Sequence, residues 1–281
     1  MASVEVFEQQ RPRLFGIAYR MLGDAREAED IVQDAWLRWQ GTPSVVENPA
    51  AFLATVVTRL SLTALDSARA RRETYVGPWL PEPVVTADDP LLGAERAEAL
   101  SLGVLVLLER LSPAERAAFV LHEAFDYPYR DIAAVLDTSE ANARQLARRA
   151  RLHVDSERRA EVSPAQREQL LARLVAALES GDLAELERHL AADVRVVSDG
   201  GGVVTAARVA VEGRERVAMF LLGIVTKQAS DVVFRPVMAN GHVSLLGMRG
   251  DTVQSVTAID FEADQVSRVY IVMNPAKLSR W

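Results

Sequence analysis

The spacing of apolar residues predicts that the first part of the chain is helical. Apolar side chains recur every three to four residues, which is the period of a helix with one buried face. Pairs typical of helix ends and starts separate the segments, among them Gly23-Asp24, Asn48-Pro49 and Ser112-Pro113. The predicted helices cover about 4–22, 25–40, 49–72, most of 94–125, 128–136 and 140–153.

The last 120 or so residues change to a mixed pattern. Ser163-Pro164 and Gly181 bound a helix at 165–180, and a short helix follows to about Leu190. Apolar and polar residues then alternate, as in half-buried strands, and Asn240-Gly241 is typical of a tight hairpin. We expect a helix at 214–226 and strands near 194–196, 203–211, 231–238, 242–249, 252–260 and 265–273, which together form an α+β domain.

A proline-rich segment separates the two helical parts. Several prolines and a glycine between Gly77 and Pro90 exclude a regular helix, so we expect an extended linker. It contains the stiff apolar segment Trp79-Leu80-Pro81-Glu82-Pro83. The predicted organisation is a helical domain at 1–74, a linker at 75–93, a second helical domain at 94–160 and the α+β domain at 163–281.

Composition excludes several classes of protein. Hydrophobic residues make up 49% and charged residues 25% of the 281 residues, which are ordinary globular values. The chain has no cysteine, which excludes disulfides, thiolate metal ligands and a cysteine nucleophile. Neither a signal peptide nor a run of about 18 apolar residues is evident. We therefore expect a cytoplasmic protein with no membrane partner, no metal site and no cofactor.

The net charge of −7 is unevenly distributed. In the predicted helix at 25–40, Glu27, Asp30 and Asp34 lie opposite the apolar stripe and repel one another at helical spacing. This face is either solvated or docks a basic partner. The next helix carries Thr55, Thr58 and Arg59 on its polar side.

The segment 128–152 has the pattern of a helix-turn-helix motif. Its second helix has a buried stripe of small and apolar residues, so the long polar side chains point outward. Arginine suits guanine and glutamine suits adenine in the major groove. A plain pair of helices with a solvated basic face is the alternative. The outward residues are Arg144, Gln145, Arg148 and Arg149.

Two runs resemble regions of bacterial sigma factors. The run from Asp24 to Trp36 resembles their core-polymerase-binding segment, and the run from Leu111 to Arg151 resembles their region 4. In this order and spacing the match covers residues 5–155 and resembles the extracytoplasmic-function sigma factors. The resemblance implies two all-α domains, region 2 and a helix-turn-helix region 4. It also implies core RNA polymerase and promoter DNA as partners in transcription initiation.

The resemblance also implies roles for individual residues. Asp30, Gln33 and Asp34 stand where the family binds the polymerase clamp helices. The helix that reads the minus-ten element carries Thr55, Thr58 and Arg59, and many family members have arginine in place of Thr55. The helix that reads the minus-thirty-five element carries Arg144, Gln145 and Arg148, with Arg149 as an expected phosphate contact.

The order of elements after residue 163 resembles a SnoaL-like, or NTF2-like, cone domain. Three motifs resemble those of a sigma-factor subgroup with this fused domain: Trp79–Pro83, Asp199-Gly200-Gly201-Gly202 and Asn274-Pro275-Ala276-Lys277-Leu278. The resemblance implies regulation in cis. We expect the Trp79–Pro83 segment to pack near the glycine loop and the C-terminal tail. The resemblance leaves open whether this domain binds a small ligand.

Two other classes of function remain as alternatives. A ligand-responsive helix-turn-helix regulator would bind promoter DNA without polymerase. An enzyme of the SnoaL-like fold would need acid–base groups, for which Asp199, Asp260 and His242 are the candidates. Their spacing does not demand acid–base chemistry, so the sequence predicts no enzyme. The acidic helix at 24–34 is required by neither alternative.

Overall fold

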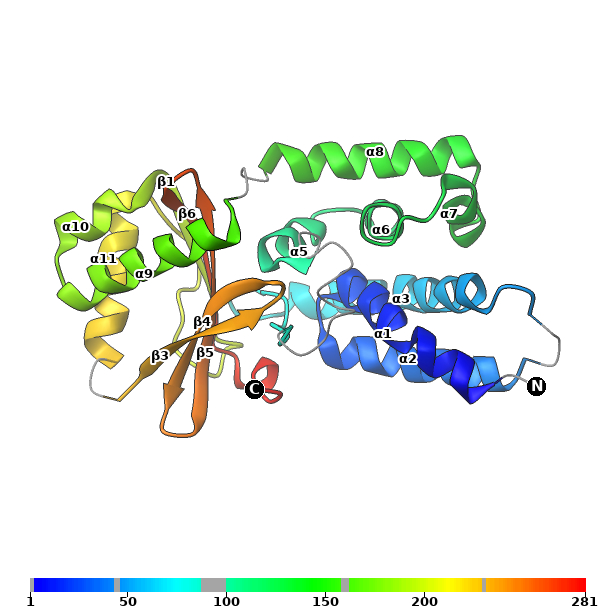
Figure 1. Cartoon of the computed structure of the whole chain (residues 1–281), viewed down its shortest axis with the longest axis horizontal. Helices are drawn as coiled ribbons and strands as arrows, with labels where there is room; N and C mark the ends of the chain where they lie inside the picture. Colours follow the sequence, from blue (N-terminus) through cyan, green and yellow to red (C-terminus); the bar gives the residue numbers. More distant parts are fainter. Residues whose placement is uncertain (1–2, 43–45, 87–99, 158–161, 229–230) are drawn as a thin grey trace. The chain divides into compact units, whose positions relative to one another are not determined.

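The computed structural model describes residues 3–42, 46–86, 100–157, 162–228 and 231–281. The chain divides into two compact units (Figure 1). The helical unit contains residues 1–74 and 88–157, and the C-terminal unit contains residues 75–87 and 158–281. The start of the predicted linker therefore groups with the C-terminal unit, although it follows the first helical domain in the sequence.

The first part of the helical unit consists of α1 (Val4–Leu22), α2 (Ala25–Gln40) and α3 (Pro49–Glu73). Their ends follow the predicted signals. Gly23 ends α1 in the left-handed conformation at φ 67°, the Asp24 side chain accepts from the Glu27 backbone at the start of α2, and Asn48 caps α3. Apolar stripes of the three helices pack against one another and form the core.

By length and apolar content, α3 is the one helix among the described residues that would suffice to cross a membrane. Arg59 and Asp66 interrupt its apolar run, so the sequence pattern did not single it out. α1 and α2 pack against it, and Leu53, Val57 and Leu65 on its inner face are buried. This is the environment of a core helix in a helical bundle.

The second part of the helical unit contains α5 (Leu102–Leu108), α6 (Pro113–Phe119), the π-helical turn η2 (Val120–Ala124), α7 (Tyr129–Leu136) and α8 (Glu140–Glu157). Ser112 and Glu115 form a capping box at the start of α6. Asp137 ends α7 in the left-handed conformation at φ 50°. α6 and α7 pack on α8, so the predicted helix-turn-helix motif is confirmed.

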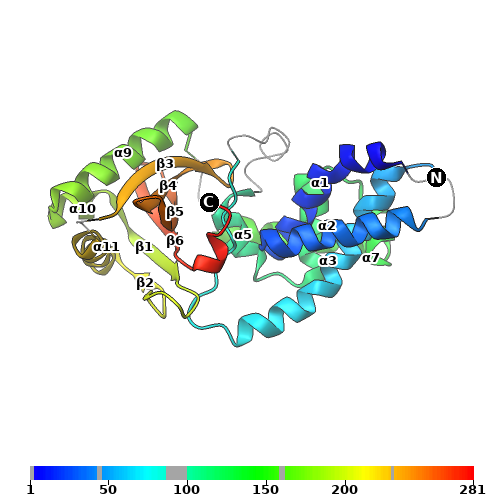
Figure 2. The ribbon, with the colours of Figure 1, turned by 90° about the horizontal axis from the view of Figure 1, so that it is seen from below.

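The C-terminal unit is a six-stranded mixed sheet with helices on one face (Figure 2). Its order is β2-β1-β6-β5-β4-β3, in which β1 and β6 are parallel and the other neighbours are antiparallel. The core lies between the sheet and the helices. The elements are α9 (Pro164–Ser180), α10 (Leu183–Arg188), β1 (Leu190–Asp199), β2 (Val211–Glu212), α11 (Arg214–Gln228), β3 (Val233–Ala239), β4 (His242–Arg249), β5 (Thr252–Glu262), β6 (Gln265–Val272) and the 3-10 turn η3 (Pro275–Lys277).

One predicted strand is wrong. The valine-rich stretch 203–211 was expected to be a strand, yet only Val211 and Glu212 pair with β1. The Val203 and Val209 side chains are 78% and 73% exposed, so neither packs on a sheet. β-branched residues favour strands only where a pleated surface covers them, and the loop after Gly200–Gly202 provides none.

Candidate polymerase, promoter and regulatory sites

The acidic face of α2 is exposed. Asp30, Gln33 and Asp34 point to solvent, and none of the three bonds to another residue in the described part of the chain. Leu37 lies one turn beyond Gln33 and is 58% exposed, which adds an apolar end that the sequence analysis missed. These four residues form a continuous surface suited to a partner with basic and apolar groups.

Glu27 does not belong to this unpaired face. The sequence pattern grouped it with Asp30 and Asp34, but its carboxylate forms an ion pair with Arg71 of α3. Burial raises the pKa of Glu27, as does Asp24, while Arg71 acts in the opposite direction. The partner lies on another helix, so helical spacing within α2 gave no sign of it.

Thr58 is not on the exposed face of α3, which corrects the sequence-based placement. Its side chain is fully buried, and its hydroxyl has no partner among the described residues. The helical period explains the burial, because Thr58 follows Ala54 by four residues and precedes Leu65 by seven, on the same buried stripe. Thr55 is half-buried, and its hydroxyl donates to the Ala51 carbonyl at 2.8 Å.

Arg59 is exposed, but its guanidinium group is hydrogen-bonded to the backbone of α7. Its Nε donates to the carbonyl of Val135 at 3.1 Å, and its Nη2 donates to the carbonyl of Ala134 at 2.9 Å. Both carbonyls lie in the last turn of α7, where they have no partner within the helix. An arginine of the first helical domain thus caps the first helix of the helix-turn-helix motif.

The outer face of α8 has the predicted orientation. Ala143, Leu146, Ala147 and Ala150 are buried, and the four polar residues are exposed. Arg144 pairs with Glu140 at 2.9 Å and lies over the Tyr129 ring, and Arg149 pairs with Glu115 at 3.1 Å. For Gln145 and Arg148 the structure describes no partner.

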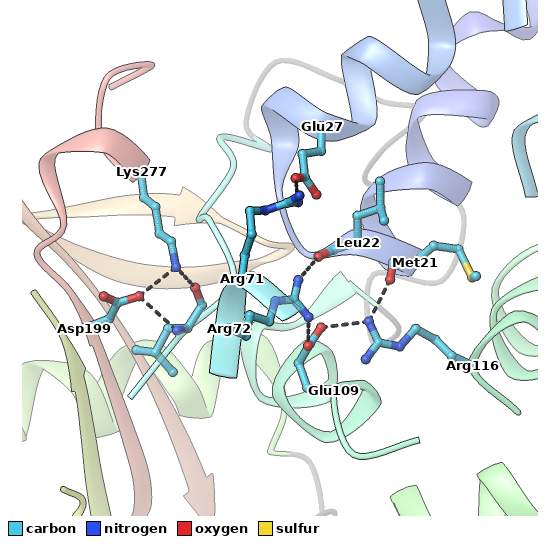
Figure 3. Close-up of polar contacts among 10 residues, drawn as sticks. Met21, Leu22, Glu27, Arg71, Arg72, Glu109, Arg116, Asp199 and Lys277 are labelled. Carbon is cyan, nitrogen blue, oxygen red and sulfur yellow. Dashed lines mark hydrogen bonds and ion pairs between the residues drawn. The ribbon is translucent and has the colours of Figure 1, made fainter. Parts of the chain in front are cut away.

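A buried ion cluster, the Glu109 cluster, joins the two parts of the helical unit (Figure 3). The Glu109 carboxylate pairs with Arg72 of α3 and accepts from Arg116 Nη1 of α6 at 2.8 Å. Arg116 also donates to the Met21 carbonyl at 2.7 Å. Burial, with the adjacent Arg116 charge, lowers the pKa of Arg72 to about 10. The Glu109 carboxylate is therefore shared by two guanidinium groups.

A second buried cluster, the Asp199 cluster, lies in the C-terminal unit (Figure 3). Asp199 is fully buried and its carboxylate accepts hydrogen bonds from four donors. The donors are Lys277 Nζ at 2.7 Å, the Leu80 backbone at 2.9 Å, the Gly201 backbone at 3.0 Å and the Tyr75 hydroxyl at 2.6 Å. The ion pair between Asp199 and Lys277 connects β1 with the C-terminal tail, and Leu80 brings in the linker.

Further contacts complete the Asp199 cluster. Lys277 also donates to the Leu80 carbonyl, and its Nζ lies 4.1 Å from the centroid of the Trp79 ring. Asn274 donates to the Tyr75 hydroxyl at 2.7 Å, and burial together with Asp199 raises the pKa of Tyr75. Gly201 has φ 64°, and a side chain there would meet Asn274 within 2.5 Å. The glycine loop is therefore required by both conformation and space.

The rest of the linker segment is held in the same way. Leu80, Pro81, Glu82, Pro83 and Val84 are buried. The Trp281 indole donates to the Pro83 carbonyl at 3.0 Å, Arg280 pairs with Glu82 at 3.5 Å, and Val84 exchanges hydrogen bonds with Asn240. Gly200, Gly202, Pro275 and Leu278 flank these contacts in the loop and the tail. The expected packing of Trp79–Pro83 against the loop and the tail agrees with this arrangement.

Comparison with known proteins decides the family. The family models for Sigma-70 region 2 and Sigma-70, region 4 match residues 6–73 and 101–154. The ECF RNA polymerase sigma factor SigJ of Mycobacterium tuberculosis is 41% identical over 98% of this chain and 93% of that protein. The chain belongs to the extracytoplasmic-function sigma factors.

A second relative and a solved structure support the same family assignment. The probable ECF RNA polymerase sigma factor SigI of M. tuberculosis is 32% identical over 95% of this chain and 92% of its own. The crystal structure of SigJ matches this sigma factor with a TM-score of 0.81 at 38% identity, covering 99% of this chain and 98% of that one. The predicted order, two helical sigma domains followed by an α+β domain, is confirmed.

Sequence reasoning missed several residues of this sigma factor. Tyr75 stands just before the motif-bearing segment, and its hydroxyl bridges Asp199 and Asn274. Glu109 was one acid among many in an amphipathic stretch, and no local signal marked its pairing with Arg72 and Arg116. Asp199, Asp260 and His242, the candidates for acid–base chemistry, do not line the apolar cavity of the C-terminal unit.

Proposed function

We propose that this sigma factor acts in the cytoplasm, binds core RNA polymerase through the acidic face of α2 and binds promoter DNA through α3 and α8. It performs no catalysis of its own in this proposal. The exposed Asp30, Gln33 and Asp34 support the first contact. The exposed outer face of α8, with Gln145 and Arg148 unengaged among the described residues, supports the second.

The test of polymerase binding is a double charge reversal, Asp30→Arg with Asp34→Arg. Both side chains are exposed and unpaired among the described residues, so the fold should tolerate the change. Like charges at an interface are strongly unfavourable, and we expect at least a tenfold loss of affinity for core polymerase in a fluorescence titration. The matched control, Glu8→Arg with Glu168→Arg, changes net charge equally at exposed positions off α2. Equal affinity of the two variants would refute the assignment.

The test of promoter reading compares three alanine variants on α8. Gln145→Ala and Arg148→Ala should each cost about 1–3 kcal/mol at one upstream base pair and relax the preference there. Arg149→Ala should instead weaken binding to all sequences and reduce its salt dependence, because the proposal gives it a phosphate contact. Run-off transcription with core polymerase on a promoter library measures both. Unchanged selectivity in all three variants would show that another face of α8 meets the DNA.

The same assay separates the alternatives. A helix-turn-helix regulator that acts without polymerase would protect duplex promoter DNA by itself, whereas a sigma factor supports promoter-specific run-off only together with core polymerase. An enzyme of the SnoaL-like fold would retain turnover after removal of the helical unit. Promoter-specific transcripts that depend on both core polymerase and this chain are the expected result.

We also propose that the C-terminal domain regulates the sigma domains in cis. The observation that carries this proposal is that residues 75–87, which follow region 2, are bound into the C-terminal unit. These residues precede region 4 in the chain. The domain therefore holds part of the only covalent connection between the two DNA-reading regions.

The compact helical unit supports such a control. The Glu109 cluster and the contacts of Arg59 with α7 keep region 2 against region 4. Arg59, which the proposal assigns to the minus-ten element, donates to two carbonyls of region 4, so it cannot contact DNA while these bonds persist. In this proposal the structure is a closed state, and regulation shifts the balance between closed and open states.

A further inference from the structure

The C-terminal unit contains a cavity of about 470 Å³ between α9 and α11 and the inner face of β3 to β6. Pockets for small molecules have volumes of about 300–1,000 Å³. We infer that this cavity is a binding site for a neutral, largely apolar small molecule that carries a hydroxyl or carbonyl group. Its apolar walls include Leu174, Leu178, Leu221, Ile224, Phe234 and Ile271.

One part of the lining is polar and unpaired. Ser255, Thr257 and Ile259 follow one another at every second position on the inner face of β5, and all three line the cavity. Ser255 is only 6% exposed, and neither hydroxyl forms a hydrogen bond with a residue that the structure describes. Both hydroxyls lie at the wall of the cavity, where a hydroxyl or carbonyl of a bound molecule would hydrogen-bond them. These two groups therefore mark where the ligand presents its own polar group.

Gly247 of β4 keeps this part of the cavity open. It pairs with Phe234 on one side and Ser255 on the other. It is not among the residues with positive φ, so its backbone does not require glycine. A side chain there would lie 2.5 Å from Ser255 Oγ and 3.2 Å from the Phe234 ring. Glycine weakens a strand interior and often marks a site where another group approaches the backbone closely. Here it leaves space for the Ser255 hydroxyl beside the cavity.

The lining also determines the charge of the ligand. Glu179 is the one charged residue among those that line the cavity, and it is exposed near the end of α9. The buried walls therefore contain no group that would balance a charge on the ligand. An ion in such walls would lose its hydration without compensation. A neutral molecule with one hydrogen-bonding group fits both the apolar walls and the two hydroxyls.

The experiment uses the full chain and a matched pair of fluorescent probes, 1-hydroxypyrene and pyrene. We expect saturable binding of one 1-hydroxypyrene per chain, about fivefold tighter than pyrene, which corresponds to one hydrogen bond of about 1 kcal/mol. Ser255→Ala with Thr257→Val should remove the fivefold difference and leave pyrene binding intact. Absence of saturable binding, or equal affinity of the two probes for the unaltered chain, would overturn the inference.

Two tryptophan variants of α11 locate the site. Ile224→Trp fills the cavity and should weaken binding of both probes at least tenfold. Met219→Trp is the matched control, because Met219 is 51% exposed on the same helix and does not line the cavity. Thermal unfolding establishes that both variants fold, and a misfolded Ile224→Trp is replaced by Val175→Trp from the opposite wall. Tight binding in the folded cavity-filling variant would contradict the assignment.

Discussion

Glu109→Gln will lower the free energy of unfolding of the helical unit by about 3–5 kcal/mol, because it removes a carboxylate charge that two largely buried guanidinium groups share. The Arg72, Arg116 and Glu109 side chains are only 15%, 4% and 19% exposed. Hydrogen exchange followed by mass spectrometry measures the loss separately in each unit. Peptides from α3, α5 and α6 should lose protection, and peptides from the sheet of the C-terminal unit should not.

The matched control is Glu27→Gln. It removes the same charge from an ion pair with the neighbouring Arg71, whose side chain is 57% exposed. Exposed pairs are worth about 0–1 kcal/mol, so the control should change protection little. If both substitutions have the same small effect, the Glu109 cluster does not hold the two sigma regions together. If the closed state limits activity, Glu109→Gln will also raise run-off transcription at low temperature, where the chain stays folded.

Asp199→Asn is expected to loosen the linker segment from the C-terminal unit. The substitution removes the Asp199 charge from a buried ion pair with Lys277, a change that costs about 3–5 kcal/mol. The measurements are hydrogen exchange of residues 75–86 and run-off transcription. We expect loss of protection in this segment and a changed promoter output. Glu212→Gln, which breaks the exposed pair with Arg195 in the same sheet, is the control.

A double substitution separates charge imbalance from general damage. Lys277→Met added to Asp199→Asn also removes the buried ammonium that paired with Asp199, so part of the lost protection should return. Additive losses would instead indicate that the two side chains act independently. Full protection of residues 75–86 in Asp199→Asn would remove the physical basis for cis regulation through this cluster.

The sequence predicted most helices because their signals are local. Asn48-Pro49, Ser112-Pro113 and Gly23 each satisfy or replace backbone groups within a few residues, so one stretch of chain suffices to recognise them. The buried stripe of α8 follows from the helical period in the same way. The face of α3 was misjudged at Thr58, since a threonine was assigned to the polar side by its chemistry and the packing places it on the buried one.

The ion clusters were beyond such reasoning. Glu109 and Arg72 are 37 residues apart, and Asp199 and Lys277 are 78 apart. No periodic pattern connects residues at these separations, and only a resemblance between motifs suggested that the linker, the loop and the tail meet. The resemblance predicted the meeting place. The bonds that form there, with Tyr75 among them, required the folded chain.

The order of elements in the chain has a consequence for synthesis on the ribosome. Residues 75–86 are made early, but β1, β3 and the tail that bind them are made after region 4. At about 5–20 residues per second, the roughly 120 residues after region 4 take about 6–24 seconds to synthesise. During that interval both sigma regions have emerged while the linker has no domain to bind. Under the proposed regulation in cis, each newly made molecule passes through a brief unregulated period before its C-terminal domain is complete.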